Sequence, residues 1–177
     1  MFTKKVDDEL ELVLVHPALA MKYATVVEAN RDYLSQWMAW APHVKTEDDF
    51  KAFVKNSLLD YANGKSMVCA IEYQGVLVGN IAFNTIKPEL KMVEIGYWLD
   101  ARYQGRGIMT RCCQAMIDIA FNHLKVEKVQ ISAAKDNYSS RGVCERLGMN
   151  LEGVITNKEV VSGRILDHAV YGLHKPK

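Results

Sequence analysis

The fold of this chain is decided by the stretch Arg102-Tyr103-Gln104-Gly105-Arg106-Gly107, which joins a predicted strand to a predicted helix. Before it, residues 91–99 follow the two-residue period that is typical of a strand. After it, apolar side chains recur over residues 109–124 at the spacing i, i+3, i+4, i+7, which predicts an amphipathic helix. A strand, a glycine-rich turn and a helix therefore follow one another in the second half of the chain.

This turn has the properties of an anion-binding loop. The first backbone N–H groups of a helix have no partner within the helix, and the helix dipole favours negative charge there. Gly105 and Gly107 would let the backbone approach a diphosphate closely, and Arg102 and Arg106 add positive charge. A plain glycine-rich turn is the alternative. The loop is neither a G-x-G-x-x-G motif, because Thr110 stands at the third glycine position, nor a Walker A loop.

The other segments predict a mixed α/β domain with one sheet and the order β-α-α-β-β-β-α-β-α-β-β. Strands are expected at residues 10–15, 67–73, 76–83, 127–133, 153–161 and 164–173, and helices at residues 17–38, from Thr46 to near Gly64, and at 138–147. Gly96, inside the strand at 91–99, indicates either a β-bulge or the close approach of a ligand.

Length and composition exclude several classes of protein. The 177 residues are expected to form a single domain over 1–177, and the net charge of +1 argues against a general nucleic-acid binder. No apolar run approaches the ~20 residues of a membrane span, and residues 1–9 are too polar for a signal peptide, so we expect a cytoplasmic protein. The four cysteines show no C-x-x-C pair and the histidines no metal-ligand spacing, so we expect reduced, buried thiols and no metal.

Three motifs in register resemble the GCN5-related N-acetyltransferase (GNAT) superfamily. Arg102-x-x-Gly105-x-Gly107 is similar to its acetyl-CoA pyrophosphate loop, residues 94–99 to its fourth strand, and residues 137–149 to its N-x-x-S…L-G-F block. Residues 151–153 and the closing hairpin resemble the RimJ/RimL-like branch, which acetylates the N-terminal α-amino groups of ribosomal proteins. The resemblance covers nearly the whole chain.

The resemblance implies a mostly antiparallel sheet, flanked by helices, whose two central strands splay apart to admit acetyl-CoA. Backbone groups at Tyr97, Trp98 and Leu99 would then bind the pantetheine arm and the thioester oxygen. Asn137 would contact pantetheine or cap the following helix, and Arg141 would reach the phosphates or lie at the surface. The residues implied to cradle the diphosphate are Gln104, Gly105, Arg106, Gly107, Ile108, Met109 and Thr110.

The catalytic groups are less clearly marked. Many superfamily members have a tyrosine seven residues after the Asn as general acid, but this chain has Cys144 there, and the RimL-like branch implies Ser140 instead. The candidate bases are Glu94 in the fourth strand and Glu159 in the last hairpin. Glu94 and Glu159 could also be ordinary solvated carboxylates on strands, and Ser140 could be an ordinary serine in the first turn of a helix. A carboxylate with a pKa of ~4.3 is a weak base unless its site raises that pKa or it acts through water.

The leading hypothesis is direct acetyl transfer from acetyl-CoA to an N-terminal α-amino group of a ribosomal or similar protein. At pH 7 an α-amine with a pKa of ~7.8 is roughly one-seventh neutral, whereas a lysine amine at ~10.4 is neutral about once in 2,500. The alternatives are acetylation of a small amine, such as a polyamine, amino acid analogue or antibiotic, or an acyl-CoA-binding module without turnover. Trp37, Trp40, Pro42 and His43 either shape a wall of the acceptor cleft or pack in the core. A homodimer is also expected.

Overall fold

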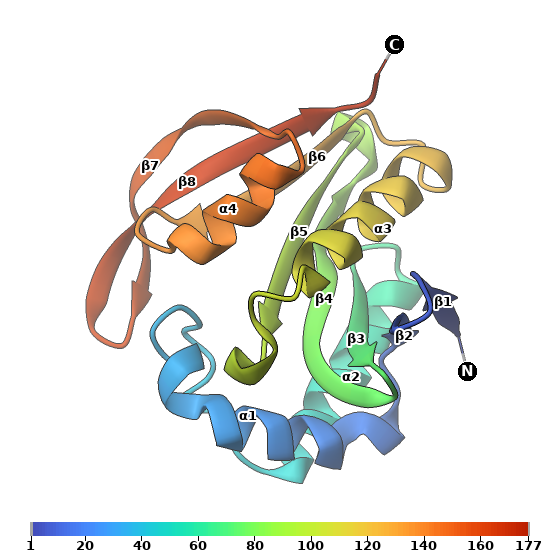
Figure 1. The fold of residues 1–177 in the computed structure, drawn as a ribbon, viewed down its shortest axis with the longest axis vertical. Helices are drawn as coiled ribbons and strands as arrows, with labels where there is room; N and C mark the ends of the chain where they lie inside the picture. Colours follow the sequence, from blue (N-terminus) through green and yellow to red (C-terminus); the bar gives the residue numbers. More distant parts are fainter. Residues whose placement is uncertain (1, 177) are drawn as a thin grey trace.

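One open sheet of eight strands organises the computed structural model, which describes residues 2–176 (Figure 1). The strand order is β1-β2-β3-β4-β5-β6-β8-β7. β5 and β6 run parallel, and every other neighbouring pair is antiparallel. The strands are β1 (Thr3–Lys5), β2 (Leu10–Leu14), β3 (Met67–Tyr73), β4 (Val76–Lys87), β5 (Met92–Leu99), β6 (Lys128–Ala134), β7 (Asn150–Val161) and β8 (Arg164–His174). The predicted mixed α/β architecture is confirmed.

Four α-helices cover the two faces of this sheet. α1 (Ala20–Leu34) and α2 (Glu47–Ala62) pack on one face, and α3 (Ile108–Asn122) and α4 (Tyr138–Arg146) pack on the other. The start of α2 has the predicted cap, because the Thr46 hydroxyl accepts from the Asp49 N–H while the Asp49 carboxylate accepts from the Thr46 N–H. Each pair of helices encloses its own apolar core against the sheet.

The central strands divide their side chains between these two cores. Val93 and Ile95 of β5 are buried with α3 and α4, whereas Trp98 is buried with α1 and α2. This alternation follows from the two-residue period of a strand. The buried side chains of β5 and β6 therefore determine the face of the sheet on which the polar side chains of these strands emerge.

β5 and β6 stay together over only part of their length. Their parallel register runs from Met92 opposite Lys128 to Ile95 opposite Ile131. Beyond that point β5 continues to pair with β4 as far as Leu99, and β6 continues to pair with β8 as far as Ala134. The two strands therefore splay apart in the middle of the sheet, as the resemblance implied.

The first predicted helix is too long. Residues 17–19 form a 3-10 turn, α1 ends at Leu34, and residues 35–45 form irregular turns. The Arg31 guanidinium donates to the carbonyl oxygens of Ala41 and Val44, which holds these turns against the end of the helix. β1 was not predicted from the sequence, and β7 begins at Asn150 instead of at the predicted residue 153.

Of the two interpretations of Gly96, the β-bulge is wrong, because the bulge lies on the neighbouring strand. Gly96 pairs regularly with Ala82, and the register shift falls between Phe83 and Thr85 of β4. The residue between them, Asn84, lays its side chain over Gly96, so that a Cβ there would lie 2.1 Å from Asn84 Nδ2. The glycine therefore serves a close approach by the protein's own side chain.

Gly79 in β4 provides a test of how tightly the sheet centre is packed. A Cβ at this position would lie 2.4 Å from the Trp98 carbonyl oxygen, which belongs to the backbone of β5 and cannot rotate away. We expect Gly79→Ala to lower the free energy of unfolding by about 1–3 kcal/mol, as overpacked sites do. Gly153→Ala is the matched control, because nothing lies within 4 Å of a Cβ there. Urea unfolding measures both, and an equal loss in the two variants would contradict this account.

Candidate functional site

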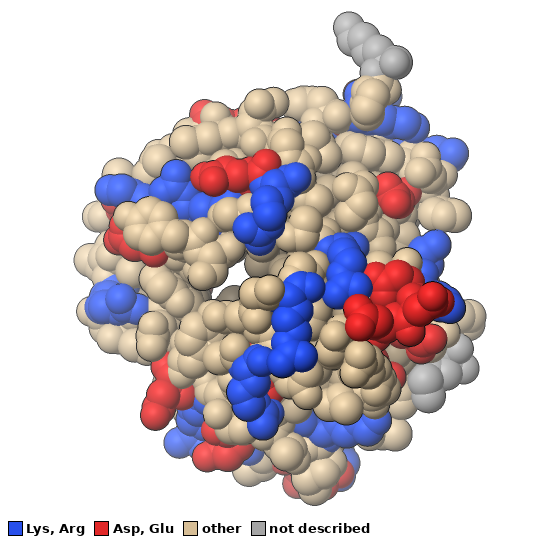
Figure 2. Space-filling view, in the orientation of Figure 1, with Lys and Arg blue, Asp and Glu red and all other residues tan. Residues whose placement is uncertain are grey.

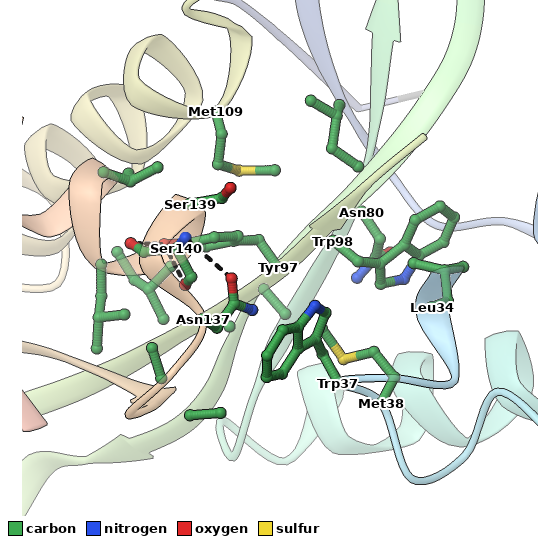
Figure 3. Close-up of a pocket in the computed structure, with 18 of the residues that line it drawn as sticks. Leu34, Trp37, Met38, Asn80, Tyr97, Trp98, Met109, Asn137, Ser139 and Ser140 are labelled. Carbon is green, nitrogen blue, oxygen red and sulfur yellow. Dashed lines mark hydrogen bonds between the residues drawn. The ribbon is translucent and has the colours of Figure 1, made fainter. Parts of the chain in front are cut away.

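A large cleft opens where β5 and β6 diverge. It has a volume of about 1370 Å³ and is lined by the splayed strands, the loop before α3, the start of α4, the segment after α1, and β7 and β8. In Figure 2 the hollow lies between α4 and α1, with Lys and Arg side chains beside it. Figure 3 shows Trp37 across the cleft from Asn137, Ser140 and Tyr97.

The glycine-rich loop forms one wall of the cleft. Gly105 and Gly107 have φ angles of +73° and +69°, which glycine adopts without strain, and Gly107 is the N-cap of α3. Because this cap has no side chain, the N–H groups of Ile108, Met109 and Thr110 receive no side-chain cap bond. These three residues, Gln104 and both glycines line the cleft.

Asp100 and Arg102 hold the loop in place. The buried Asp100 carboxylate accepts from the Arg102 backbone N–H at 2.9 Å and from its guanidinium Nη2 at 2.6 Å. Burial by itself would raise the pKa of Asp100, but the hydrogen bonds from Arg102 and Asn30, together with the Arg102 charge, outweigh it and lower that pKa below the usual value. The Gln104 side chain also donates to the Tyr33 hydroxyl of α1. Arg102 is therefore engaged within the loop.

Two of the predicted cofactor-binding arginines lie outside the lining of this cleft. The Arg106 guanidinium lies 5.2 Å from the ring centroid of Tyr103 and borders a separate, smaller hollow. The Arg141 guanidinium donates to the Tyr171 hydroxyl at 3.0 Å and to the Lys135 carbonyl oxygen at 2.9 Å.

Ser140 and Tyr97 meet on the α3/α4 side of the cleft. The Tyr97 hydroxyl donates to the Ser140 carbonyl oxygen at 3.1 Å and lies 3.0 Å from Ser140 Oγ. Asn137 accepts a hydrogen bond from the Ser140 N–H at 3.2 Å and so caps α4, which is one of the two roles expected for it.

Cys144 is a poor candidate for the general acid. Burial raises the pKa of Cys144 to about 12, and its thiol faces the Ser140 carbonyl oxygen. Ser140, and not Cys144, is among the residues that line the cleft.

The two candidate bases also line the cleft, on the other face of the sheet. Glu94 accepts from Gln130 Nε2 at 3.0 Å, and Glu159 Oε2 lies 3.1 Å from His168 Nε2. Glu94 shares its strand face with Trp98, which packs with α1 and α2. The cleft thus passes through the sheet, with Ser140 on one side and both carboxylates on the other.

Two polar residues that line the cleft, His168 and Ser132, were not predicted as site residues from the sequence. The spacing of the histidines only argued against a metal site, whereas the structure places His168 in the cleft between Ser132 and Glu159. The alternation of the last strand could have placed His168 on one face with Leu166 and Val170, but only the pairing of β8 with β6 brings it to Ser132.

Trp37 and Trp40 of the expected aromatic cluster both line the cleft. Trp40 also packs against Trp98, with ring centroids 6.1 Å apart, so it both lines the cleft and packs against the core. The tip of the β7–β8 hairpin reaches this segment, where Ser162 Oγ donates to the Ser35 carbonyl oxygen at 2.8 Å. The Arg164 guanidinium lies 5.8 Å from the Trp37 ring centroid. The hairpin tip therefore bridges one end of the cleft.

Other candidate sites are not supported among residues 2–176. All four cysteines are free and buried, as expected. Within the described part of the chain, no cluster of three or more His, Cys, Asp or Glu side chains could hold a metal. No helix in that range is long and apolar enough to cross a membrane.

A splayed sheet with a glycine-rich loop at the start of the following helix defines an acetyltransferase of the kind that the sequence motifs resemble. Comparison with protein families matches residues 11–150 to the "Acetyltransferase (GNAT) domain". The chain belongs to this family.

Several relatives extend the similarity to the whole chain. It is 31% identical to the ribosomal-protein-serine acetyltransferase of Escherichia coli, over 96% of this chain and 94% of that protein. The structure of RimL, a ribosomal L7/L12 α-N-protein acetyltransferase in complex with coenzyme A, superposes with a TM-score of 0.94 and 27% identity over 98% of both chains. The microcin C7 self-immunity acetyltransferase MccE, in complex with acetyl-CoA and AMP, gives a TM-score of 0.92 and 30% identity over 97% of this chain and 95% of its own.

The Asp100–Arg102 pair predicts a pH-dependent contribution to stability. Because the folded-state pKa of Asp100 is depressed, its contribution is present above the ordinary carboxyl pKa of ~3.9 and is lost as the pH falls through the folded-state value. We expect Asp100→Asn to destabilise the protein at pH 7, and the difference from the native chain to narrow toward pH 3.

Urea unfolding at the two pH values measures this difference. Asp8→Asn is the control, because the Asp8 side chain is 97% exposed in its pair with Lys5 and such pairs contribute little. A gap between Asp100→Asn and the native chain that stays constant with pH would show that the Asp100 charge is not what holds the loop.

Proposed function

We propose that this protein transfers the acetyl group of acetyl-CoA to the N-terminal α-amino group of a ribosomal protein. The observation that carries the proposal is the cleft through the sheet, with a glycine-rich helix start on one face and carboxylates on the other. The end-to-end similarity to the E. coli ribosomal-protein-serine acetyltransferase and to RimL supports this acceptor.

Acetyl-CoA would enter from the α3/α4 side. The diphosphate would lie on the backbone N–H groups of residues 104–110, where a helix start and two glycines favour an anion. The pantetheine arm would follow the edge of β5 at Tyr97, Trp98 and Leu99, which β6 leaves open, and would contact Asn137. Arg106 and Arg141 would reach the phosphates by turning away from Tyr103 and Tyr171. No metal takes part in this proposal.

The reaction would be direct attack in a complex of both substrates. The neutral amine nitrogen bonds to the thioester carbonyl carbon, a tetrahedral oxyanion forms, and the C–S bond then breaks to release the CoA thiolate. Ser140, held by Tyr97, would donate a hydrogen bond or a proton to the departing sulfur. Glu159 would accept the proton that the amine loses, and Glu94 is the second candidate for this role.

The proposal also includes a cytoplasmic homodimer that binds no nucleic acid directly. The near-neutral charge argues against direct binding of nucleic acid, because a surface that binds the nucleic-acid backbone needs an excess of basic residues. Exposed apolar side chains on the β7–β8 hairpin, among them Val154, Val160 and Ile165, offer a surface for a second copy.

A thiol-release assay with acetyl-CoA tests the function. We expect turnover with peptides that begin with Ser, Ala or Met, since an α-amine is partly neutral at pH 7, and little turnover with a panel of polyamines and amino acid analogues. Turnover of small amines without peptides would overturn the acceptor. CoA binding without turnover of any amine would identify a non-catalytic module.

Variants of the proposed catalytic groups test the mechanism. We expect Ser140→Ala and Glu159→Gln each to lower kcat by about 100-fold, the smaller end of general acid–base contributions, while calorimetry shows unchanged CoA affinity. Glu152→Gln is the matched control, because Glu152 is also on β7 but pairs with Lys128 instead of facing the cleft. Full activity in both site variants would contradict these assignments, and Glu94→Gln would then be the variant to examine.

A further inference from the structure

A continuous chain of hydrogen bonds runs along the side of the cleft that faces α1 and α2. Ser132 Oγ lies 2.9 Å from His168 Nδ1, and His168 Nε2 lies 3.1 Å from Glu159 Oε2. All three residues line the cleft. The chain leads from a serine at the splay point of the sheet to a carboxylate that is 38% exposed, through an imidazole that is only 13% exposed.

Hydrogen-bond chemistry determines the direction of this chain. An ionised carboxylate only accepts, so His168 Nε2 must carry the hydrogen that it donates to Glu159. In a neutral imidazole Nδ1 is then an acceptor, so the Ser132 hydroxyl donates to it. Each group is therefore ready to pass one proton toward Glu159.

The sheet register brings these three residues together. Ser132 of β6 lies opposite Val170 of β8, so His168, two residues from Val170, emerges on the same face as Ser132. On its other side β8 pairs with β7, where Ile155 lies opposite His168 and Glu159 lies opposite Leu166. Four residues of β7 therefore match two residues of β8. Despite this irregularity, Glu159 emerges on the same face of the sheet as His168.

The irregular stretch of β7 has its own anchor. Asn157 has a φ of +51°, and its backbone N–H donates to Asp167 Oδ1 at 3.0 Å. The extra residues of β7 are thus held by β8 itself, next to His168 in the sequence. Glu159 is consequently positioned by the sheet and not by a free loop.

We propose that Ser132, His168 and Glu159 form a proton-transfer chain that deprotonates the acceptor amine, with Ser132 as the group that touches the amine. This inference rests on the proposed function. It makes Glu159 the end of the chain, and His168 a residue that acts through Ser132. It also lets Glu159 act without touching the amine, because Ser132 and His168 carry the proton between them.

The proton balance of this step is simple. The acceptor ammonium gives one proton to Ser132 Oγ, while the Ser132 hydroxyl proton moves to His168 Nδ1. The proton on His168 Nε2 moves to the Glu159 carboxylate, which is partly exposed and releases the proton to water. The amine becomes neutral, the serine is unchanged, and the imidazole exchanges one tautomer for the other. No bond between heavy atoms changes in this step.

Kinetics of His168→Gln test the chain. The glutamine amide nitrogen can replace Nε2 as donor to Glu159 but cannot relay a proton, so a merely structural role would survive the change. We expect kcat to fall by about 100-fold, with the KM for acetyl-CoA changed less than about two-fold. Ser132→Ala should cause a similar loss, and the double variant no further loss, because groups that act as a unit are not additive. Added imidazole should restore part of the activity of His168→Gly.

The control is His174→Gln, which makes the same substitution at the end of β8, where the side chain is 67% exposed. It should keep full activity. A His168→Gln enzyme that also keeps full activity would overturn the chain while leaving the acetyltransferase function intact. A native protein that acetylates no amine would instead contradict the proposed function.

The tautomer of His168 can be measured without turnover. Nitrogen NMR of the labelled native protein should show a hydrogen on Nε2 and an acceptor Nδ1 whose shift changes in Ser132→Ala. A hydrogen on Nδ1 in the neutral imidazole would overturn the proposed direction of transfer, whatever the enzyme acetylates.

Discussion

The short parallel pairing of β5 and β6 is the constraint on which the rest of the site depends. The two strands are joined from Met92 and Lys128 to Ile95 and Ile131, and then each follows its other neighbour. Backbone groups that would otherwise satisfy one another across the ladder are left facing a cleft. In an unbroken sheet the two faces would be separate surfaces, whereas here one cavity connects them.

This opening divides the chemistry between the two faces. The glycine-rich loop, Tyr97 and Ser140 lie with α3 and α4, and Glu94, Ser132 and His168 emerge on the side of α1 and α2. Strand alternation enforces the division, because neighbouring residues of β5 and β6 must point to opposite faces. A thioester that approached from one side would thus meet an amine from the other.

Local features of the site could be predicted from the sequence, and long-range ones could not. The strand, loop and helix around Gly105 and Gly107, and the capping box at Thr46, depend on residues a few positions apart. The end of α1 at Leu34 was missed because Arg31 stabilises the following turns through carbonyl groups ten or more residues away. A bulge was one of two interpretations of Gly96, and it was wrong because the side chain that crowds Gly96 belongs to Asn84, on another strand.

The sequence by itself determined the family, the glycine-rich loop and the residue types at the cleft, since these follow from short-range spacing and motif order. Only the tertiary structure decided how those residues meet. It placed Ser140 against Tyr97, turned Arg106 and Arg141 away from the cleft, and set His168 between Ser132 and Glu159. The physical reason is that strand pairing joins residues 36 positions apart, as it does Ser132 and His168, and no local pattern encodes such a contact.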